Sequence, residues 1–178
     1  MKIKLHNMKK ILTVLLATMM LFLATGALAE AAASDVIEVA PVENGTVVPF
    51  ADHNFQITLP SDWNVLAVTE EQAAVGIIYS CANPEGTRTF TIAYTEFDTA
   101  TDLDTVAGSL AATYQNVQTV TINSIPFVSY EIPANDVAGI ATLNAAGTGM
   151  YQFVFYPASD AEYGQLAAQI AASITTIE

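Results

Sequence analysis

Hydrophobic and polar residues alternate along much of the chain with the two-residue period of half-buried β-strands. The first clear strand covers residues 55–59, where Phe55, Ile57 and Leu59 share one face. Residues 75–81 and 88–95 follow, and the turn-forming residues 83–86 between them predict a β-hairpin.

Four more strands come in quick succession, at residues 117–122, 125–132, 137–143 and 150–156. Their short connections, such as the two residues Asn123-Ser124, predict antiparallel neighbours. Proline cannot donate a hydrogen bond to a neighbouring strand, so Pro126 predicts that the second of these strands begins at a sheet edge.

The period changes to that of an α-helix in two places. The first stripe consists of Leu103, Val106, Ala107, Leu110, Ala111 and Tyr114, and the second of Tyr163, Leu166, Ala167, Ile170 and Ile174. Thr101 and Asp104 have the spacing of a capping box at the start of the first helix, and Ser159 and Glu162 at the start of the second.

These elements predict one α+β domain over residues 53–178. Two main helices with apolar stripes need a sheet to cover them, and six to seven mainly antiparallel strands supply it. The expected architecture is a layered α-β-α sandwich with a mainly antiparallel central sheet.

The first 29 residues have the layout of a secretory signal peptide. Four lysines precede an apolar run, residues 11–23, and Ala27-Leu28-Ala29 has the small residues of a cleavage site. An uncleaved membrane anchor is the alternative, because residues 11–29 come close to the length of a membrane span. The protein is therefore expected to be secreted or in the cell envelope, or else anchored by its N-terminus.

Residues 30–52 predict a flexible leader or an edge hairpin. Asn44-Gly45 lies between the β-prone segments 36–39 and 46–48, which favours a hairpin. Pro41 and Pro49 would confine that hairpin to a sheet edge.

The charge of the processed chain restricts its partners. Cleavage after Ala29 leaves Arg88 as the only Lys or Arg against all 18 acidic residues, a formal charge of −17. Nucleic acid is excluded, because its binding depends on Lys and Arg at the phosphates. An anionic membrane surface would repel such a chain too, so no membrane contact is expected after cleavage.

Few residues suggest catalysis or metal binding. His53 has no nucleophile motif near it, and the single cysteine, Cys81, ends an apolar run and is expected to be a buried, inert thiol. One His and one Cys cannot form a zinc cluster, and Asp98, Asp102 and Asp104 lack the spacing of a calcium loop. We therefore expect no catalytic residue, no metal and no cofactor.

Arg88 and Tyr79 are the candidate ligand-binding residues. A lone guanidinium in an acidic domain could bind an anionic group, and pairing with a nearby carboxylate such as Glu85 or Glu96 is the structural alternative. Trp63 is expected to fill the core.

The order of motifs resembles that of the PsbP-like proteins, a group that includes the Mog-type import factors and small exported bacterial domains of unknown role. The resemblance covers residues 55–174 and rests on three motifs: Leu59-Pro60-x-x-Trp63, Ile122-Asn123-Ser124-Ile125-Pro126-Phe127, and Tyr151-x-Phe153-x-Phe155. It implies an α-β-α sandwich whose members mostly bind or assemble other proteins, and it assigns no functional residue.

The expected function is that of a non-catalytic, acidic, exported domain that binds another extracellular or envelope protein, or assists envelope assembly. An apolar patch on one sheet face is the surface feature that this function calls for. A small-ligand binder with a pocket near Arg88 and Tyr79 is the first alternative. A hydrolase that uses paired carboxylates is the second.

Overall fold

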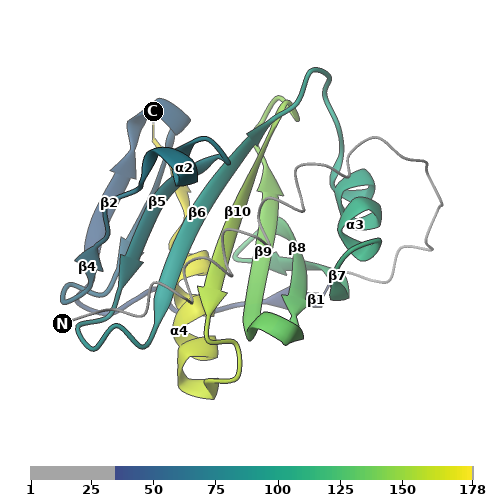
Figure 1. The fold of residues 1–178 in the computed structure, drawn as a ribbon. Helices are drawn as coiled ribbons and strands as arrows, with labels where there is room; N and C mark the ends of the chain where they lie inside the picture. The colour runs from purple at the N-terminus through teal and green to yellow at the C-terminus, as the bar shows by residue number, and fades with distance from the viewer. Residues whose placement is uncertain (1–34, 178) are drawn as a thin grey trace.

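A computed structural model describes residues 35–177, which form two β-sheets and three α-helices (Figure 1). In the larger sheet the strands lie in the order β1-β7-β8-β9-β10-β6-β5-β4. Their bounds are β1 (Asp35–Ile37), β7 (Gln115–Ile122), β8 (Ile125–Ile132), β9 (Val137–Leu143), β10 (Gly149–Tyr156), β6 (Thr89–Glu96), β5 (Ile77–Ala82) and β4 (Asn64–Val65). Six of the seven pairs of neighbouring strands in this sheet are antiparallel, which confirms the predicted α+β class.

A smaller sheet has the order β11-β3-β2, with β11 (Thr175–Thr176), β3 (Phe55–Leu59) and β2 (Thr46–Phe50). The predicted hairpin between residues 36–39 and 46–48 is wrong. β2 pairs with β3, and β1 lies parallel to β7 at the far edge of the larger sheet. The Asn-Gly pair thus precedes β2 without joining it to β1. The predicted signal peptide, residues 1–29, lies outside the described residues.

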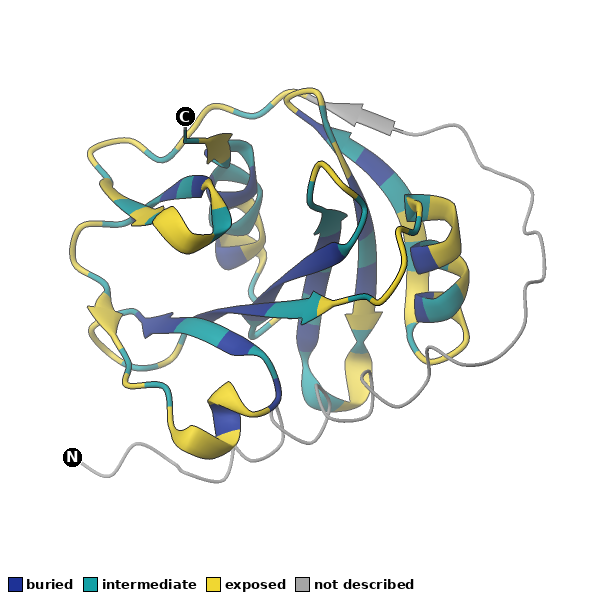
Figure 2. Ribbon diagram, turned by 90° about the horizontal axis from the view of Figure 1, so that it is seen from above, coloured by how far each residue is buried: buried dark blue, intermediate teal, exposed yellow. Residues whose placement is uncertain are grey.

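The main core lies between the larger sheet and a layer made of the smaller sheet and α4 (Ala161–Ala172). Phe90, Phe127 and Phe153 are fully buried or nearly so from the sheet side, and Ile57 and Ile170 meet them from the other layer. The opposite sheet face packs against α3 (Leu103–Ala111), which turns its buried side toward the sheet in Figure 2. The result is the predicted three-layer sandwich.

The N-cap residue of each long helix lies one position later than predicted, at Asp102 for α3 and at Asp160 for α4. Asp102 caps α3 by accepting a hydrogen bond from the Thr105 N–H, and Asp160 caps α4 through the N–H groups of Glu162 and Tyr163. The Ser159 hydroxyl instead donates to the Asp136 carboxylate at 2.8 Å. A tertiary contact therefore removes the serine from the capping position.

A short helix, α2 (Glu70–Ala73), lies between β4 and β5. Thr69 caps it, and the Gln72 side chain accepts from the Thr69 N–H to complete a capping box. Its neighbours Val68 and Val75 pack over Ile77 and Ala93 on the sheet. None of the helices among residues 35–177 has the length and apolar character that a membrane span requires.

The predicted tight turn between β7 and β8 is confirmed. Asn123 and Ser124 both have positive φ, 45° and 71°, as the favoured two-residue hairpin turn requires. Pro126 lies in an interior strand, but pairing between β8 and β9 begins only at Val128. Its position is therefore locally an edge, which is why a proline fits there.

Candidate functional site

Arg88 ties the β5–β6 hairpin to the start of α4. Its Nη2 lies 2.7 Å from Asp160 Oδ2 and 3.2 Å from Glu162 Oε2, and its Nε donates to Asp160 at 2.8 Å. The guanidinium also lies over the Tyr163 ring, 5.8 Å from the ring centre. The prediction of carboxylate pairing is confirmed, but the predicted partners Glu85 and Glu96 are wrong.

The chemistry of this cluster is that of a satisfied ion pair. The hydrogen bond to Asp160 raises the pKa of Arg88, and Glu162 adds to the effect. The pKa of Asp160 is lowered, first by the Tyr163 backbone N–H and then by Arg88. Three of the five guanidinium N–H groups can thus be accounted for by two carboxylates, and the pair helps to hold the α4 N-terminus on the sheet.

Tyr79 lies in β5, where its ring meets Phe50 edge-on at 5.3 Å between ring centres. Burial raises the pKa of its phenol, and the neighbouring Cys81 adds to this shift. Burial also raises the pKa of the Cys81 thiol, to about 12, although a hydrogen bond with Tyr79 opposes that shift. Cys81 is fully buried, so it is placed as the sequence suggested.

Arg88 and Tyr79 do not converge on one site. Tyr79 pairs with Ile92, which lies four residues along β6 from Arg88, or roughly 13 Å at the rise of a strand. Each side chain packs against other partners, Arg88 on Tyr163 and Tyr79 on Phe50. Ligand binding at these two residues stays a prediction.

His53 ends a short 3₁₀ helix, η1 (Ala51–His53), and lies in an aromatic cluster. Its ring centre is 4.8 Å from that of Tyr94 and 5.6 Å from that of Tyr151. The Tyr151 hydroxyl lies 3.4 Å from His53 Nδ1 and 3.3 Å from its carbonyl oxygen. This arrangement positions His53 as a packing residue, with a phenol where a catalytic histidine would need an aliphatic hydroxyl and an acid.

Trp63 packs against Tyr163, with ring centres 5.8 Å apart, and is partly buried at the rim of the main core. This confirms its predicted role in the core. Within residues 35–177, no three His, Cys, Asp or Glu side chains lie close enough to hold a metal ion. Asp102 serves instead as the α3 cap, and the hydrogen bonds from Thr105 lower its pKa.

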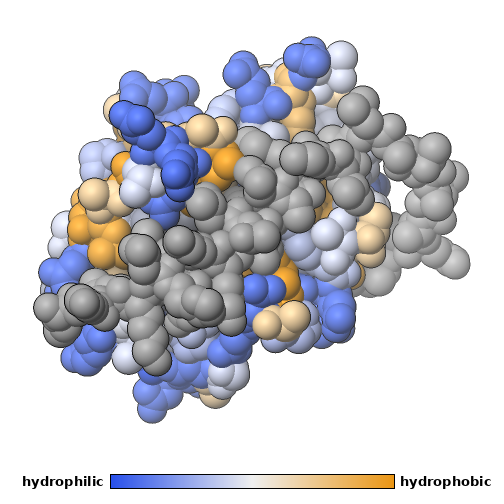
Figure 3. Space-filling view, viewed as in Figure 1, coloured by the Kyte–Doolittle hydropathy of each residue, from blue (hydrophilic) through white to orange (hydrophobic). Residues whose placement is uncertain are grey.

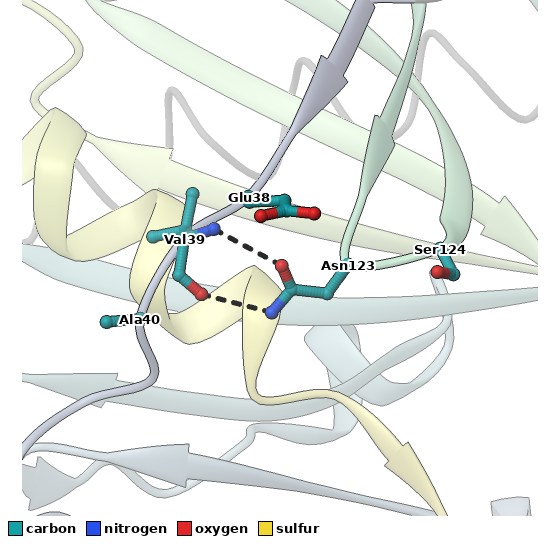
Figure 4. A pocket seen from close by; sticks show the side chains of 5 residues that line it. All are labelled: Glu38, Val39, Ala40, Asn123 and Ser124. Atoms are coloured by element: carbon teal, nitrogen blue, oxygen red, sulfur yellow. Dashed lines mark hydrogen bonds between the residues drawn. The ribbon is translucent and has the colours of Figure 1, made fainter.

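A hollow of about 460 Å³ lies beside the turn between β7 and β8 (Figure 4). Its lining residues are Glu38, Val39, Ala40, Asn123 and Ser124. The Asn123 carboxamide accepts from the Val39 N–H at 3.2 Å and donates to the Val39 carbonyl at 3.0 Å. The amide thus ties the N-terminal segment to this turn.

No local sequence signal indicates this role for Asn123, because its partner Val39 is 84 residues away. The sequence predicts Asn123 as a turn residue, and the structure confirms this. Only the folded chain brings Val39 beside it. With the amide engaged, Glu38 and Ser124 are the polar side chains that the hollow offers to a ligand.

Two large apolar side chains are exposed among the described residues, Val47 at 53% and Val65 at 68%. They lie on β2 and β4, each the last strand of its sheet, and both strands lie along one side of the molecule in Figure 1. On the part of the face that grey atoms leave visible in Figure 3, apolar residues form separate spots among polar ones. The exposed valines therefore lie on edge strands, whereas the expected function calls for an apolar patch on one sheet face.

The two edges share chemical features. Asp62 is exposed shortly before β4, and Glu43 shortly before β2. Pro49 in β2 has no N–H to offer a further strand, which limits edge-to-edge pairing. We call Glu43, Val47, Asp62 and Val65 the edge surface.

The described residues thus form a three-layer α+β sandwich with one large exposed apolar side chain on each of the edge strands β2 and β4. No protein-family model and no curated protein matches the chain. Among solved structures it is similar to the solution structure of cyanobacterial PsbP (CyanoP) from Synechocystis sp. PCC 6803. That match has a TM-score of 0.53 and 11% identity, and covers 85% of this chain and 99% of the other.

A crystal structure from Bacteroides thetaiotaomicron VPI-5482 gives a TM-score of 0.49 at 16% identity, over 70% of this chain and 46% of the other, which is too low to support an argument. At such identities the likeness to CyanoP shows the fold alone. The fold is PsbP-like, as the sequence resemblance implied. The Mog-type resemblance stays a prediction.

Proposed function

We propose that this protein is an exported, non-catalytic accessory domain that binds another protein outside the cytoplasm. The signal-like sequence of residues 1–29 supports export. The engagement of the chemically capable side chains supports a role without catalysis. His53 lies against Tyr151, Cys81 is buried as a thiol, and Arg88 is held by two carboxylates.

The observation that carries the proposal is the edge surface. Protein interfaces have an apolar centre that loses its water and a polar rim that does not. Val47 and Val65 supply apolar side chains at two strand edges, and Glu43 and Asp62 supply negative charge beside them. The partner that fits this surface has exposed apolar residues bordered by Lys or Arg. Complementary charge would also speed its approach to a strongly acidic domain.

The test uses the exported protein as bait in an extract of its native cell envelope. A variant with Val47→Glu and Val65→Glu is expected to lose at least one protein that the wild type captures, because a buried unpaired charge opposes association. The matched control carries Thr99→Glu and Thr113→Glu, which add the same charge at exposed positions away from the edge surface. Circular dichroism checks that all three proteins are folded.

The proposal would be contradicted if both double variants lost the captured protein equally, because added charge alone would then explain the loss. It would also be contradicted if neither variant lost it. Capture that persists unchanged at high salt would contradict the predicted basic rim of the partner. The two alternatives from the sequence, a small-ligand binder and a carboxylate hydrolase, stay predictions.

A further inference from the structure

Asn44 is the one asparagine in the chain that precedes a glycine. The other eight asparagines precede Met, Phe, Val, Pro, Ser, Asp or Ala. This matters because glycine has no side chain to shield its backbone nitrogen from the asparagine carboxamide. Asparagine is also among the residues that are chemically labile over time.

The side chain of Asn44 is held less firmly than those of Asn83, Asn116 and Asn123, which also lie in or beside turns. It is exposed, and no hydrogen bond of its carboxamide is found among the described residues. The carboxamide of Asn123 makes three hydrogen bonds, and that of Asn83 donates to Glu85 and Thr87. Asn116 donates to Glu131. The Asn44 carboxamide is therefore free to turn toward the next peptide bond.

The backbone at Asn44 is in an uncommon conformation. Its φ is 53°, in the left-handed region that few residues with a side chain adopt. The turn precedes β2, an edge strand that pairs only with β3. Local opening at such a position costs far less than unfolding of the domain, and it allows Asn44 to leave its left-handed conformation.

We propose that Asn44 is a site of spontaneous deamidation, which converts it to aspartate and isoaspartate. The Gly45 nitrogen attacks Cγ of Asn44, a C–N bond forms, and the bond from Cγ to Nδ2 breaks. Ammonia leaves with the proton from the Gly45 nitrogen, and a succinimide ring remains. Water then opens the ring at either carbonyl, without any oxidant or reductant.

The modification has a structural consequence at β2. Isoaspartate adds a carbon to the main chain and places a negative charge at the turn. Gly45 has little room to adjust, since a Cβ there would lie 2.7 Å from the Leu59 carbonyl oxygen. The first β2–β3 pair, Thr46 with Leu59, follows directly. Modified protein is therefore expected to pair β2 less firmly, next to the Val47 of the edge surface.

The test is to keep the purified protein at mildly basic pH and follow it by mass spectrometry. The expected result is a mass gain equal to the exchange of NH₂ for OH, located by peptide mapping at Asn44. An isoaspartate-specific methyltransferase should label the same peptide. Asn44→Gln should abolish the gain, because glutamine forms the corresponding ring far more slowly. Hydrogen exchange in β2 should rise in the modified fraction.

A Ser124→Gly variant supplies the internal control. It creates a second Asn-Gly pair, at Asn123, whose carboxamide is held by three hydrogen bonds. Asn44 should react several-fold faster than Asn123 in this variant. Equal rates at the two positions, or no reaction at Asn44 in the wild type, would overturn the inference. Neither result bears on the proposed partner, since the reaction needs only water.

Discussion

Cys81 shows how burial decides the chemistry of a single residue. It is fully buried within the main core, and desolvation raises the pKa of its thiol to about 12. Only the thiolate reacts with electrophiles, and burial in apolar surroundings disfavours it. A lone cysteine on a protein surface is ordinarily a candidate for cross-linking, and in this fold burial in the core prevents that.

We predict that Cys81 is unreactive toward maleimide or Ellman's reagent in the native protein at pH 8, about four pH units below its pKa. The thiol should react fully once urea unfolds the chain. The labelling rate should therefore follow the unfolding transition measured by tryptophan fluorescence of Trp63. Rapid labelling under native conditions would mean that Cys81 is accessible.

Two glycines, Gly139 in β9 and Gly164 in α4, differ in how much space surrounds them. A Cβ on Gly139 of β9 would run into the ring and hydroxyl of Tyr130 on β8, whereas nothing lies within 4 Å of one on Gly164 of α4. Tyr130 is buried, so its ring cannot swing out to make room. The same substitution is thus expected to have opposite effects in the two elements.

Gly139→Ala should lower the free energy of unfolding by about 1–3 kcal/mol, as overpacking does in a filled core. Gly164→Ala should raise it by about 0.5–1 kcal/mol, because alanine loses less backbone entropy in a helix. Urea unfolding of the two variants and the wild type measures both effects. Changes of the same sign would contradict the local packing described for Gly139.

The helix caps make the stability of α3 and α4 depend on pH. The hydrogen bonds to Asp102 and Asp160 lower the pKa of both carboxyls in the folded state. A depressed folded pKa means that the caps stabilise the fold above the unfolded value, about 4. This stabilisation is lost as the pH falls through the folded pKa.

A variant with Asp102→Asn and Asp160→Asn keeps both capping oxygens without the titration. It should be less stable than the wild type at pH 7, and the difference in melting temperature should shrink as the pH falls toward 3. Comparing the two proteins cancels the relief of repulsion among the other carboxylates. A constant difference across this range would show that the caps do not titrate as described.

The whole molecule carries a large excess of negative charge. Between residues 35 and 177, two ion pairs, both of Arg88, offset it. Like charges spread over one compact domain oppose folding, and dissolved salt screens them. The sandwich must therefore be stable through its apolar layers, with the surface electrostatics working against it.

We predict that sodium chloride raises the melting temperature of the protein. The rise per unit of added salt should be steep at low concentration and smaller at higher concentration. Sodium sulfate at the same ionic strength separates screening from the general stabilising effect of sulfate. The two salts should agree at low ionic strength and diverge above it. A melting temperature that falls on addition of chloride would mean that the Arg88 pairs outweigh the repulsion.

The sequence determined the local elements of this protein, because side-chain period and turn chemistry act within a few residues. The bounds of β3, β8 and β9, and the Asn123-Ser124 turn, were predicted correctly from alternation and turn residues alone. The predicted sandwich follows from the same information, since apolar faces of known period must cover one another.

Tertiary structure decided which elements meet. The β-prone residues 46–48 favour a strand without indicating its partner, and only the folded chain pairs β2 with β3 and places β1 beside β7. The same is true of Arg88, which lies 72 and 74 residues from its carboxylates, and of Ser159, which Asp136 holds away from the cap. Such contacts depend on the path of the whole chain, whereas the period of a strand does not.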